Sequence, residues 1–220
     1  MDQHTPGTRA AGTMPAMLVD ISRPVAPGVA VWPGDTPYAL TLSDWGSVRV
    51  GAATLSLHTG THVDAPLHHC PDGDPIDSVS LDAFLGRAQV IDVAGIASIG
   101  PADIGIPLAP RILLRTAAWP VGAPFPSEIP VLTDPAIDHL AAHGVVLLGV
   151  DVPSVDRIDS TDLPNHHRLA RSGIAILESL DLSDATPGRH TLIALPLRLI
   201  GADASPVRAL LVPEGAKENP

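Results

Sequence analysis

The chain consists of short apolar runs separated by prolines and glycines. It contains 24 prolines and 19 glycines among 220 residues, and they are spread along the sequence instead of gathering in one linker. Runs of β-branched residues and leucine between such residues are typical of strands. We expect strands, or extended segments at the first two positions, at 17–22, 29–34, 88–95, 111–117, 145–150, 174–179, 191–200 and 207–212.

One further run has the period of two that is typical of a strand with one buried face. Residues 50–58, VGAATLSLH, alternate small or polar side chains with apolar ones. Successive side chains of a strand point to opposite faces, so this alternation predicts a half-buried strand. The histidine-rich segment that follows would then begin where this strand ends.

Two segments carry the start and stop signals of helices. Thr133-Asp134-Pro135 offers a capping side chain and a first-turn proline for a helix through His143, and Gly144 can adopt the left-handed conformation that ends it. Asn165 can cap a second helix, HHRLARS, which Gly173 would close. Both helices run directly into strands. This order predicts a single α/β domain in which the sheet is the larger part.

Length and composition fit one domain. A chain of 220 residues with 45% hydrophobic content can bury a sizeable core without a second domain. We expect residues 17–213 to form that domain, residues 1–16 to be a disordered N-terminal extension, and residues 214–220 to be a C-terminal tail.

The charge balance limits the partners. With 13 lysines and arginines against 24 aspartates and glutamates, the formal net charge is -11. A nucleic-acid backbone or an anionic membrane surface would be repelled, so we expect neither as a partner. No stretch approaches the roughly 20 apolar residues of a membrane helix, and the N-terminal segment lacks the apolar run of a signal peptide. The single cysteine, Cys70, rules out an intrachain disulfide and suits a cytoplasmic location.

The segment Leu57–Cys70, LHTGTHVDAPLHHC, concentrates side chains that bind metals. Gly60 and Pro66 oppose a continuous helix, so the side chains must converge from a turn. The candidates are His58, His62, Asp64 and His68, with His69 as an open neighbour. Imidazole together with carboxylate suits zinc, manganese or a similar divalent ion. These histidines could instead be ordinary surface or core residues, but four of them around one aspartate in a short segment favour a metal site.

A second segment can complete such a site. A helix of about eight residues that begins at His166 rises ~12 Å. A strand from Gly173 to Glu178 then returns ~16 Å, so His166 and Glu178 reach the same end of the layer. Glu178 follows the apolar run IAIL, and a buried carboxylate needs a cation partner. The residues alone leave open whether the adjacent His167 takes part.

These two segments resemble the metal-dependent cyclase-type hydrolase family. Its signature, His-x-Gly-Thr-His-x-Asp-x-Pro-x-His, is matched at every fixed position by HTGTHVDAPLH, residues 58–68. Supporting stretches are DIS (20–22), WPGDTP (32–37), DVPSVD (151–156), AILE (175–178) and ALPLRLIGADASPVRALL (194–211). The resemblance implies a sheet-rich β/β/α fold of the swivelling, cyclase-like type. It also implies a homodimer, for which apolar strands near the N-terminus could pair across subunits.

The resemblance further implies a binuclear metal site, with zinc in the best-known members and manganese as an alternative. Carried onto this sequence, its ligands are His58, His62, Asp64, His166 and Glu178. Asp64 and Glu178 would bridge the two ions. His68 would be the general acid/base and not a ligand, and Trp32 would line the pocket against an aromatic ring of the substrate.

Within the family, the softer motifs resemble the arylformamidase branch. This implies hydrolysis of N-formyl-L-kynurenine to L-kynurenine and formate, in tryptophan degradation by the kynurenine pathway. A related enzyme would act on a cyclic amide such as isatin, or on another small amide or lactone. A metal-storage or sensing module is the non-enzymatic alternative. Such a module has no use for a histidine set aside from the ligands, so His68 favours an enzyme.

Overall fold

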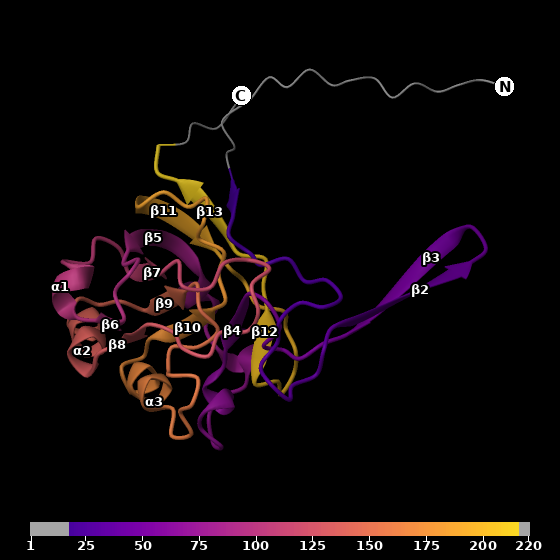
Figure 1. Cartoon of the computed structure of the whole chain (residues 1–220), viewed down its shortest axis with the longest axis horizontal. Coiled ribbons are helices and arrows are strands. Elements are labelled where there is room, and N and C mark those ends of the chain that lie inside the picture. Colours follow the sequence, from indigo (N-terminus) through magenta and orange to yellow (C-terminus); the bar gives the residue numbers. More distant parts are fainter. Residues whose placement is uncertain (1–17, 216–220) are drawn as a thin grey trace.

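A nine-stranded mixed sheet forms the body of the protein in a computed structural model that describes residues 18–215 (Figure 1). In spatial order its strands are β1 (Val19–Asp20), β13 (Leu210–Pro213), β11 (Gly188–Ile193), β5 (Leu85–Asp92), β7 (Arg111–Arg115), β9 (Leu147–Val150), β10 (Ala175–Glu178), β4 (His62–Asp64) and β12 (Ala204–Pro206). The pairings from β5 through β10 are parallel, and the others are antiparallel. The expected N-terminal extension and residues 216–220 of the expected tail lie outside the described residues.

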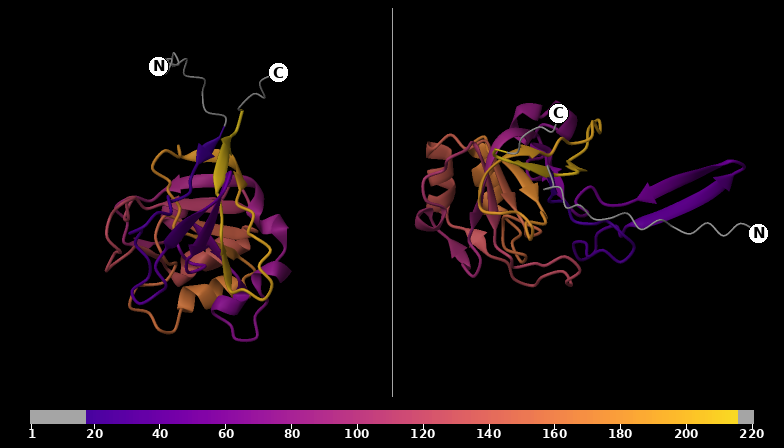
Figure 2. Two further views of the ribbon diagram at one scale, coloured as in Figure 1. Left: turned by 90° about the vertical axis from the view of Figure 1, so that its right-hand side faces the viewer. Right: turned by 90° about the horizontal axis from the view of Figure 1, so that it is seen from above.

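The sheet curls strongly, and the expected α/β fold with the sheet as its larger part is confirmed (Figures 1 and 2). The α-helices are α1 (Pro101–Ile104), α2 (Asp134–Ala142) and α3 (Pro164–Arg171), and the short 3-10 helices are η1 (Pro66–His68), η2 (Ile76–Ser78) and η3 (Leu81–Phe84). Within residues 18–215, none of the helices has the length and apolar character that crossing a membrane requires.

The central strands are buried on both faces. In β7, Ile112 and Leu114 join a core cluster that includes Leu140 of α2 and Leu169 of α3. Leu113, between them, joins a second cluster on the other face. Strands that are covered on both sides read as continuous apolar runs, which is why the run at 111–117 predicts this strand.

Both predicted helices are present, but only the first is capped as expected. Thr133 caps α2 by accepting a hydrogen bond from the Ala136 amide, and Gly144 follows the helix with a φ of +70°. The expected Asn165 cap is wrong, because α3 begins at Pro164 and Asn165 lies in its first turn. The Asn165 amide donates at 2.9 Å to the carboxylate of Asp156, so a side chain outside the helix satisfies this end.

Residues 50–58 do not form the predicted half-buried strand. Strand β3 (Val48–Thr54) pairs with β2 (Ala39–Trp45) in a hairpin whose residues are all exposed. The hairpin projects far from the body, as Figure 1 and the right-hand view of Figure 2 show. The alternation is present in the sequence, but a two-stranded ribbon has no core beneath either face.

Residues 29–34 form the extended segment that is one of the two expectations there, and they end in a turn. Two smaller differences concern a strand end and two short strands. Strand β11 ends at Ile193 before Pro196, which has no N–H to offer a ladder. A two-stranded parallel sheet of β6 (Ser98–Ile99) and β8 (Val131–Leu132) has no counterpart among the predicted strands.

Candidate metal centre

Strand pairing brings three of the predicted site residues onto one face of the sheet. Strand β4 lies between β10 and β12, and its register with β10 places His62 opposite Glu178 and Asp64 opposite Ile176. Directly paired residues share a face, and so do residues two apart in one strand. The side chains of His62, Asp64 and Glu178 therefore project from the same face.

His58 and His68 come from the segments on either side of β4. Before the strand, Gly60 has a φ of +68°, and a Cβ there would lie 2.8 Å from Val25 Cγ2. Only glycine fits this turn without strain, and the turn carries His58 back beside β4. After the strand, η1 ends at His68. The predicted absence of a continuous helix is confirmed, although the middle of the segment is a strand and not a turn.

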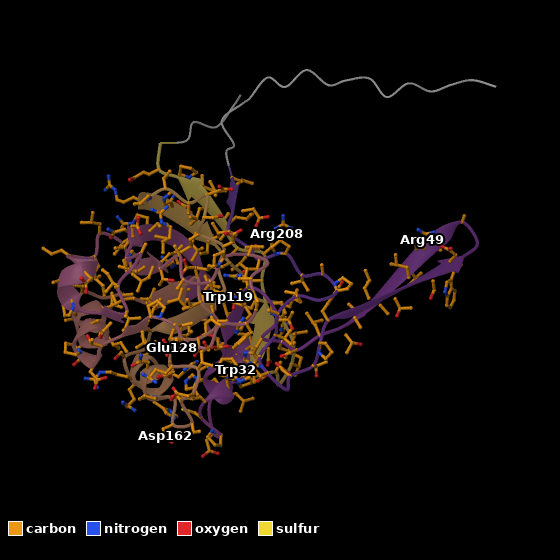
Figure 3. The ribbon with its side chains drawn as sticks, in the orientation of Figure 1. Trp32, Arg49, Trp119, Glu128, Asp162 and Arg208 are labelled. Carbon is orange, nitrogen blue, oxygen red and sulfur yellow. The ribbon has the colours of Figure 1, made fainter. Side chains whose placement is uncertain are left out.

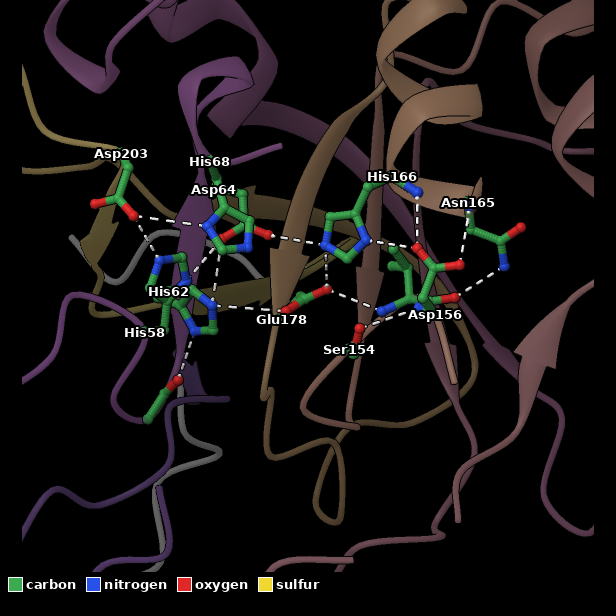
Figure 4. A network of polar contacts seen from close by, with 12 residues as sticks. His58, His62, Asp64, His68, Ser154, Asp156, Asn165, His166, Glu178 and Asp203 are labelled. Atoms are coloured by element: carbon green, nitrogen blue, oxygen red, sulfur yellow. Dashed lines mark hydrogen bonds and ion pairs between the residues drawn. The ribbon is translucent and has the colours of Figure 1, made fainter. Parts of the chain in front are cut away.

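Asp64 lies at the centre of the cluster (Figure 4). Its Oδ1 atom is 3.1 Å from His58 Nδ1 and 3.4 Å from His62 Nε2, and its Oδ2 atom is 3.6 Å from His166 Nε2. The Oε2 atom of Glu178 is 3.6 Å from His62 Nε2, and its Oε1 atom is 3.5 Å from His166 Nε2. The structure therefore brings all five predicted ligands together.

Helix α3 and strand β10 deliver His166 and Glu178 to the same end of the layer, as the lengths of the two elements predict. Asp156 fixes the imidazole of His166, since its Oδ2 atom is 2.7 Å from His166 Nδ1 and also accepts a hydrogen bond from the His166 amide at 3.1 Å. With Nδ1 held by Asp156, Nε2 is left to face Asp64 and Glu178.

Neither of the two neighbouring histidines belongs to a group of possible metal ligands, although the ring centroid of His69 lies 5.5 Å from that of His166. The Nδ1 atom of His167 is 3.8 Å from the Sγ atom of Cys70, away from the carboxylates. Both ring nitrogens of His69 are buried without a hydrogen-bond partner among the described residues. Of the two adjacent histidines in α3, it is His166 that faces the carboxylates.

The centre is buried, and neighbouring carboxylates raise the pKa of His58 and His166. His62 and His166 are 2% exposed, and Asp64 and Glu178 are 4% exposed. Burial lowers the pKa of His166, but its carboxylate neighbours outweigh this effect and raise the pKa to about 10. In the same way the neighbours of His58, which are Asp64 and Asp203, raise its pKa to about 9 against the effect of burial.

The two central carboxylates respond in opposite directions. Burial and the charge of Asp64 raise the pKa of Glu178 to about 7. Burial acts to raise the pKa of Asp64 too, but the proximity of His166, His58 and His62 lowers it well below its usual range. The pKa of His68 is lowered by burial and by the charges of His58 and His166, which favours its neutral form.

The donor atoms fit divalent cations. Within the part of the chain that the structure describes, His62 Nε2 and both carboxylate oxygens of Asp64 are buried without a hydrogen-bond partner. Buried polar atoms without partners are costly, and a cation would satisfy them. Two sets of ligand atoms lie within 4.8 Å of one another and share Asp64: His62, Asp64 and Glu178 in one, and His58, Asp64 and His68 in the other. Asp64 could therefore bridge two ions.

Sequence reasoning misses two further carboxylates of the site, Asp156 and Asp203. Asp203 Oδ2 is 3.0 Å from His58 Nε2 and 3.6 Å from His68 Nδ1. Both residues lie within stretches that support the family resemblance, DVPSVD (151–156) and ALPLRLIGADASPVRALL (194–211), but those stretches do not single them out. Their roles depend on contacts with residues distant in the chain, which those stretches do not reveal.

A cavity of about 300 Å³ opens onto the cluster, and His58, His68 and Glu178 are among its lining residues. Trp32, Trp119 and Phe125 line it as well. The rings of Trp32 and Phe125 meet edge to face at 5.2 Å between centroids, and those of Trp119 and Phe125 at 5.8 Å. Both tryptophans lie on the hairpin side of the body (Figure 3). Of these three aromatic residues, only Trp32 is predicted from the sequence to line the pocket.

The chain is an α/β protein with a curled mixed sheet and a buried His/Asp/Glu centre. Comparison with known proteins identifies the family to which it belongs. A family model described as "Putative cyclase" matches residues 19–157. The chain belongs to this cyclase family.

Individual relatives cover nearly the whole chain. It is 47% identical over 210 residues to a kynurenine formamidase of Salinibacter ruber, spanning 88% of this chain and 96% of that protein. It is 43% identical over 202 residues to a kynurenine formamidase of Bacillus cereus, spanning 89% of this chain and 97% of that protein. A solved structure described as a "predicted metal-dependent hydrolase", from Bacillus stearothermophilus, matches with a TM-score of 0.74 and 27% identity, over 88% of this chain and 97% of that one.

Proposed function

We propose that the protein is a kynurenine formamidase, an arylformamidase that hydrolyses N-formyl-L-kynurenine to L-kynurenine and formate in tryptophan degradation by the kynurenine pathway. The kynurenine formamidases of S. ruber and B. cereus support this function, at 47% and 43% identity over most of the chain. The structural observation that carries the proposal is the buried cluster of histidines and carboxylates beside an aromatic-lined cavity.

We infer that the centre holds two divalent ions, zinc or alternatively manganese. The side chains that would hold them are His58, His62, Asp64, His166 and Glu178. Asp64 and Glu178 each offer two oxygens, so they can bridge the pair and offset part of its charge. When bound, such ions polarise the formyl carbonyl and lower the pKa of an attacking water toward about 7.

His68 would move the proton of the reaction. Hydrolysis forms a C–O bond and breaks the C–N bond of the formamide, so the proton lost by water must reach the departing aniline nitrogen. An imidazole can accept that proton and return it, because it titrates near neutral pH. His68 lines the cavity, and burial lowers its pKa and favours the neutral form that accepts a proton.

The aryl ring of the substrate would lie against Trp32. A tryptophan ring offers a large flat surface with one polar edge, which suits an aromatic group that carries polar substituents. Trp32 is 37% exposed, so part of its ring is open to solvent, and Phe125 supports it from the side. Trp119 and Phe125 would complete the aromatic lining.

We also propose a homodimer, formed through the projecting hairpin. Five of its apolar side chains, between 48% and 71% exposed, are Leu40, Leu42, Trp45, Val48 and Val50. The register of the hairpin places Leu40 and Leu42 on one face and Trp45, Val48 and Val50 on the other. A two-stranded hairpin is marginally stable by itself, and exposed apolar side chains on both of its faces mark an interaction site. A second copy of the chain would cover them. The single cysteine fits a reducing compartment, and we propose the cytoplasm as the location.

The substrate assignment is tested by comparing kcat/KM of the zinc-loaded protein for N-formylkynurenine and for isatin. Isatin stands for the second candidate, a cyclic-amide hydrolase, because an aromatic-lined cavity also suits a flat bicyclic ring. We expect the formamide to be preferred by about a hundredfold or more. A preference for isatin would assign the second function. Bound zinc without turnover of either compound would indicate a metal-binding module instead of an enzyme.

A further inference from the structure

Asp203 is a carboxylate that the proposed mechanism does not use, yet its backbone is fixed beside the centre. It directly precedes β12, which pairs antiparallel with β4. Its carbonyl accepts a hydrogen bond from the Ala65 amide at 2.9 Å, and the Asp77 carboxylate accepts one from the Gly201 amide at 2.8 Å. The segment that carries Asp203 is therefore held against the strand that carries two predicted metal ligands.

One oxygen of Asp203 contacts two imidazoles (Figure 4). Its Oδ2 atom is 3.0 Å from His58 Nε2 and 3.6 Å from His68 Nδ1, and the centroids of these two rings are 4.2 Å apart. The side chain of Asp203 is 42% exposed, so water could satisfy it without either histidine. Because burial does not force these contacts, the placement of the carboxylate between the two rings indicates a role toward the two histidines.

With metal bound, the contacts of Asp203 favour one tautomer for each imidazole. An ionised carboxylate only accepts hydrogen bonds, so a ring that is hydrogen-bonded to it has to present an N–H group. For His58 this is Nε2–H, which leaves the Nδ1 lone pair facing the centre, 3.1 Å from Asp64 Oδ1. The His68 contact of 3.6 Å is longer than a hydrogen bond, but the negative charge of Asp203 beside Nδ1 favours a proton on that nitrogen, which leaves the Nε2 lone pair free to accept a proton. Histidines that ligate metals commonly donate their other N–H to a carboxylate in this way.

We propose that Asp203 is a positioning residue that fixes the ring orientation and tautomer of both His58 and His68. One carboxylate would then fix the position of a metal ligand relative to that of the proton-transfer group. The part that concerns turnover rests on the proposed function. The competing explanation is purely structural: the backbone of Asp203 holds its loop, and the side chain has no effect on either histidine.

The test uses two variants and a matched control. Asp203→Ala removes both contacts, and Asp203→Asn keeps the shape of the side chain without its charge. Asp77→Ala is the control, because Asp77 holds the same loop by accepting a hydrogen bond from the Gly201 amide and alanine removes that acceptor. Histidine tautomers are read from the side-chain nitrogen shifts of zinc-loaded, nitrogen-15-labelled protein. Zinc affinity is measured by competition with a chromophoric chelator, and kcat and KM are measured with N-formylkynurenine.

We expect wild-type His68 in the Nδ1–H tautomer and His58 in the Nε2–H tautomer, and Asp203→Ala should disturb both. Its zinc affinity should fall about 10-fold to 100-fold. Its kcat should fall about tenfold or more with KM within about threefold, as expected for a group that acts on the reaction step more than on substrate binding. Asp203→Asn should show the same changes more weakly, and it carries the test if the alanine variant does not fold.

A double variant separates the two contacts of Asp203. In a His68→Ala background the effect of Asp203→Ala on kcat should disappear, whereas its effect on zinc affinity should remain. The proposal is overturned if the Asp203 variants keep wild-type tautomers and zinc affinity, or if Asp77→Ala reproduces their effects. If wild-type protein binds zinc with the expected tautomers but releases no formate, the proposed function fails and the positioning role stands.

Discussion

At the scale of single residues, Asp64 explains why the centre needs cations. It is 4% exposed, three imidazole nitrogens lie within 3.6 Å of its oxygens, and the equally buried Glu178 lies on the same face of the sheet. Two carboxylates this close repel each other in a site with little water, and the pKa of Glu178 rises to about 7 by burial and by the charge of Asp64. Divalent ions would relieve that repulsion and use the unpaired donor atoms of Asp64 and His62.

Replacing His68 with alanine separates proton transfer from metal binding. We expect kcat to fall about 10²-fold to 10⁴-fold, the usual contribution of a general acid/base, because no other group would return the proton to nitrogen. Bound zinc, measured by atomic absorption, should stay at the wild-type level. The Nδ1 or Nε2 atom of His68 lies close enough to His58 and Asp64 to be a ligand, so loss of one zinc ion per chain would show that His68 holds metal instead.

The pH dependence of the metal-free protein follows from its histidines. In the folded chain the pKa of His58 is about 9 and that of His166 about 10, both above the ordinary value of 6.5. Protonation therefore stabilises the folded metal-free chain. This contribution is fully present below about pH 6.5 and is lost as the pH rises through 9 and 10. The raised pKa of Glu178, about 7, acts in the same direction between its ordinary value and neutral pH.

We therefore expect the melting temperature of chelator-treated protein to fall between about pH 6.5 and pH 9.5, while zinc-loaded protein changes less, because its histidines are already deprotonated by the metal. Zinc affinity should rise over the same range, with release of protons on binding. Scanning calorimetry of both forms checks the first expectation. Metal-free protein that is as stable at the upper pH as at the lower one would show that these imidazoles are not protonated in the folded chain.

The sequence could predict which side chains meet at the centre because most of them sit in one short motif. His58, His62 and Asp64 belong to an eleven-residue signature, and the distance from His166 to Glu178 is set by one helix and one strand. Asp156 and Asp203 have no such local signature. Asp203 meets His58 across 145 positions of the chain, and that contact exists only because β12 pairs with β4 in one particular register.

At the scale of elements, the local sequence pattern predicts a helix or strand correctly where the core covers that element. The apolar run at 111–117 predicts β7 because both faces of that strand are buried, and Thr133 predicts the start of α2 because its capping contact is local. The alternation at 50–58 predicts a buried face that the hairpin lacks. The Asn165 cap failed because Asp156, outside the helix, supplies the oxygen that the sequence pattern assigns to Asn165.

The packing around strand β9 can be tested at Gly149. A Cβ at this position would lie 2.4 Å from Leu113 Cδ2 and 3.0 Å from Leu180 Cδ1, and both leucines are fully buried. We expect Gly149→Ala to lower the free energy of unfolding by about 1 to 3 kcal/mol, because the core must shift to admit the methyl group. Urea unfolding of the zinc-loaded protein measures this.

Gly100→Ala is the matched control for this prediction. A Cβ at Gly100 meets nothing closer than 3.6 Å, so the substitution should cost much less. Equal unfolding midpoints for the Gly149 and Gly100 variants would mean that the packing around β9 is looser than the structure shows.

The hairpin provides the test of the proposed homodimer. Leu42 in β2 and Leu81 in η3 are 57% and 53% exposed, so either can be replaced by aspartate without disturbing the core. Sedimentation should show a wild-type dimer, and Leu42→Asp should weaken it about tenfold or more by placing a charge in the interface. Leu81→Asp should sediment as the wild type does. A monomeric wild-type protein, or a Leu42→Asp variant that dimerises normally, would rule out this interface.

At the scale of the whole molecule, the sequence predicts the class of fold but not its arrangement. Helices that run into strands predict a mixed α/β fold, and that is what the chain forms. The spatial order of the strands, in which β4 is inserted between β10 and β12, depends on long-range pairing that no local pattern encodes. That insertion creates the centre, since it places the signature motif of residues 58–68 beside the strand that ends in Glu178.

The most direct test of the account is a metal titration of chelator-treated protein, followed by release of formate from N-formylkynurenine. We expect no turnover after exhaustive chelation. Turnover should recover with zinc or manganese and level off at about two ions per chain. Thermal stability should recover over the same titration. Full turnover in protein stripped of metal, or full metal binding with no formate released, would contradict metal-dependent hydrolysis of N-formylkynurenine by this protein.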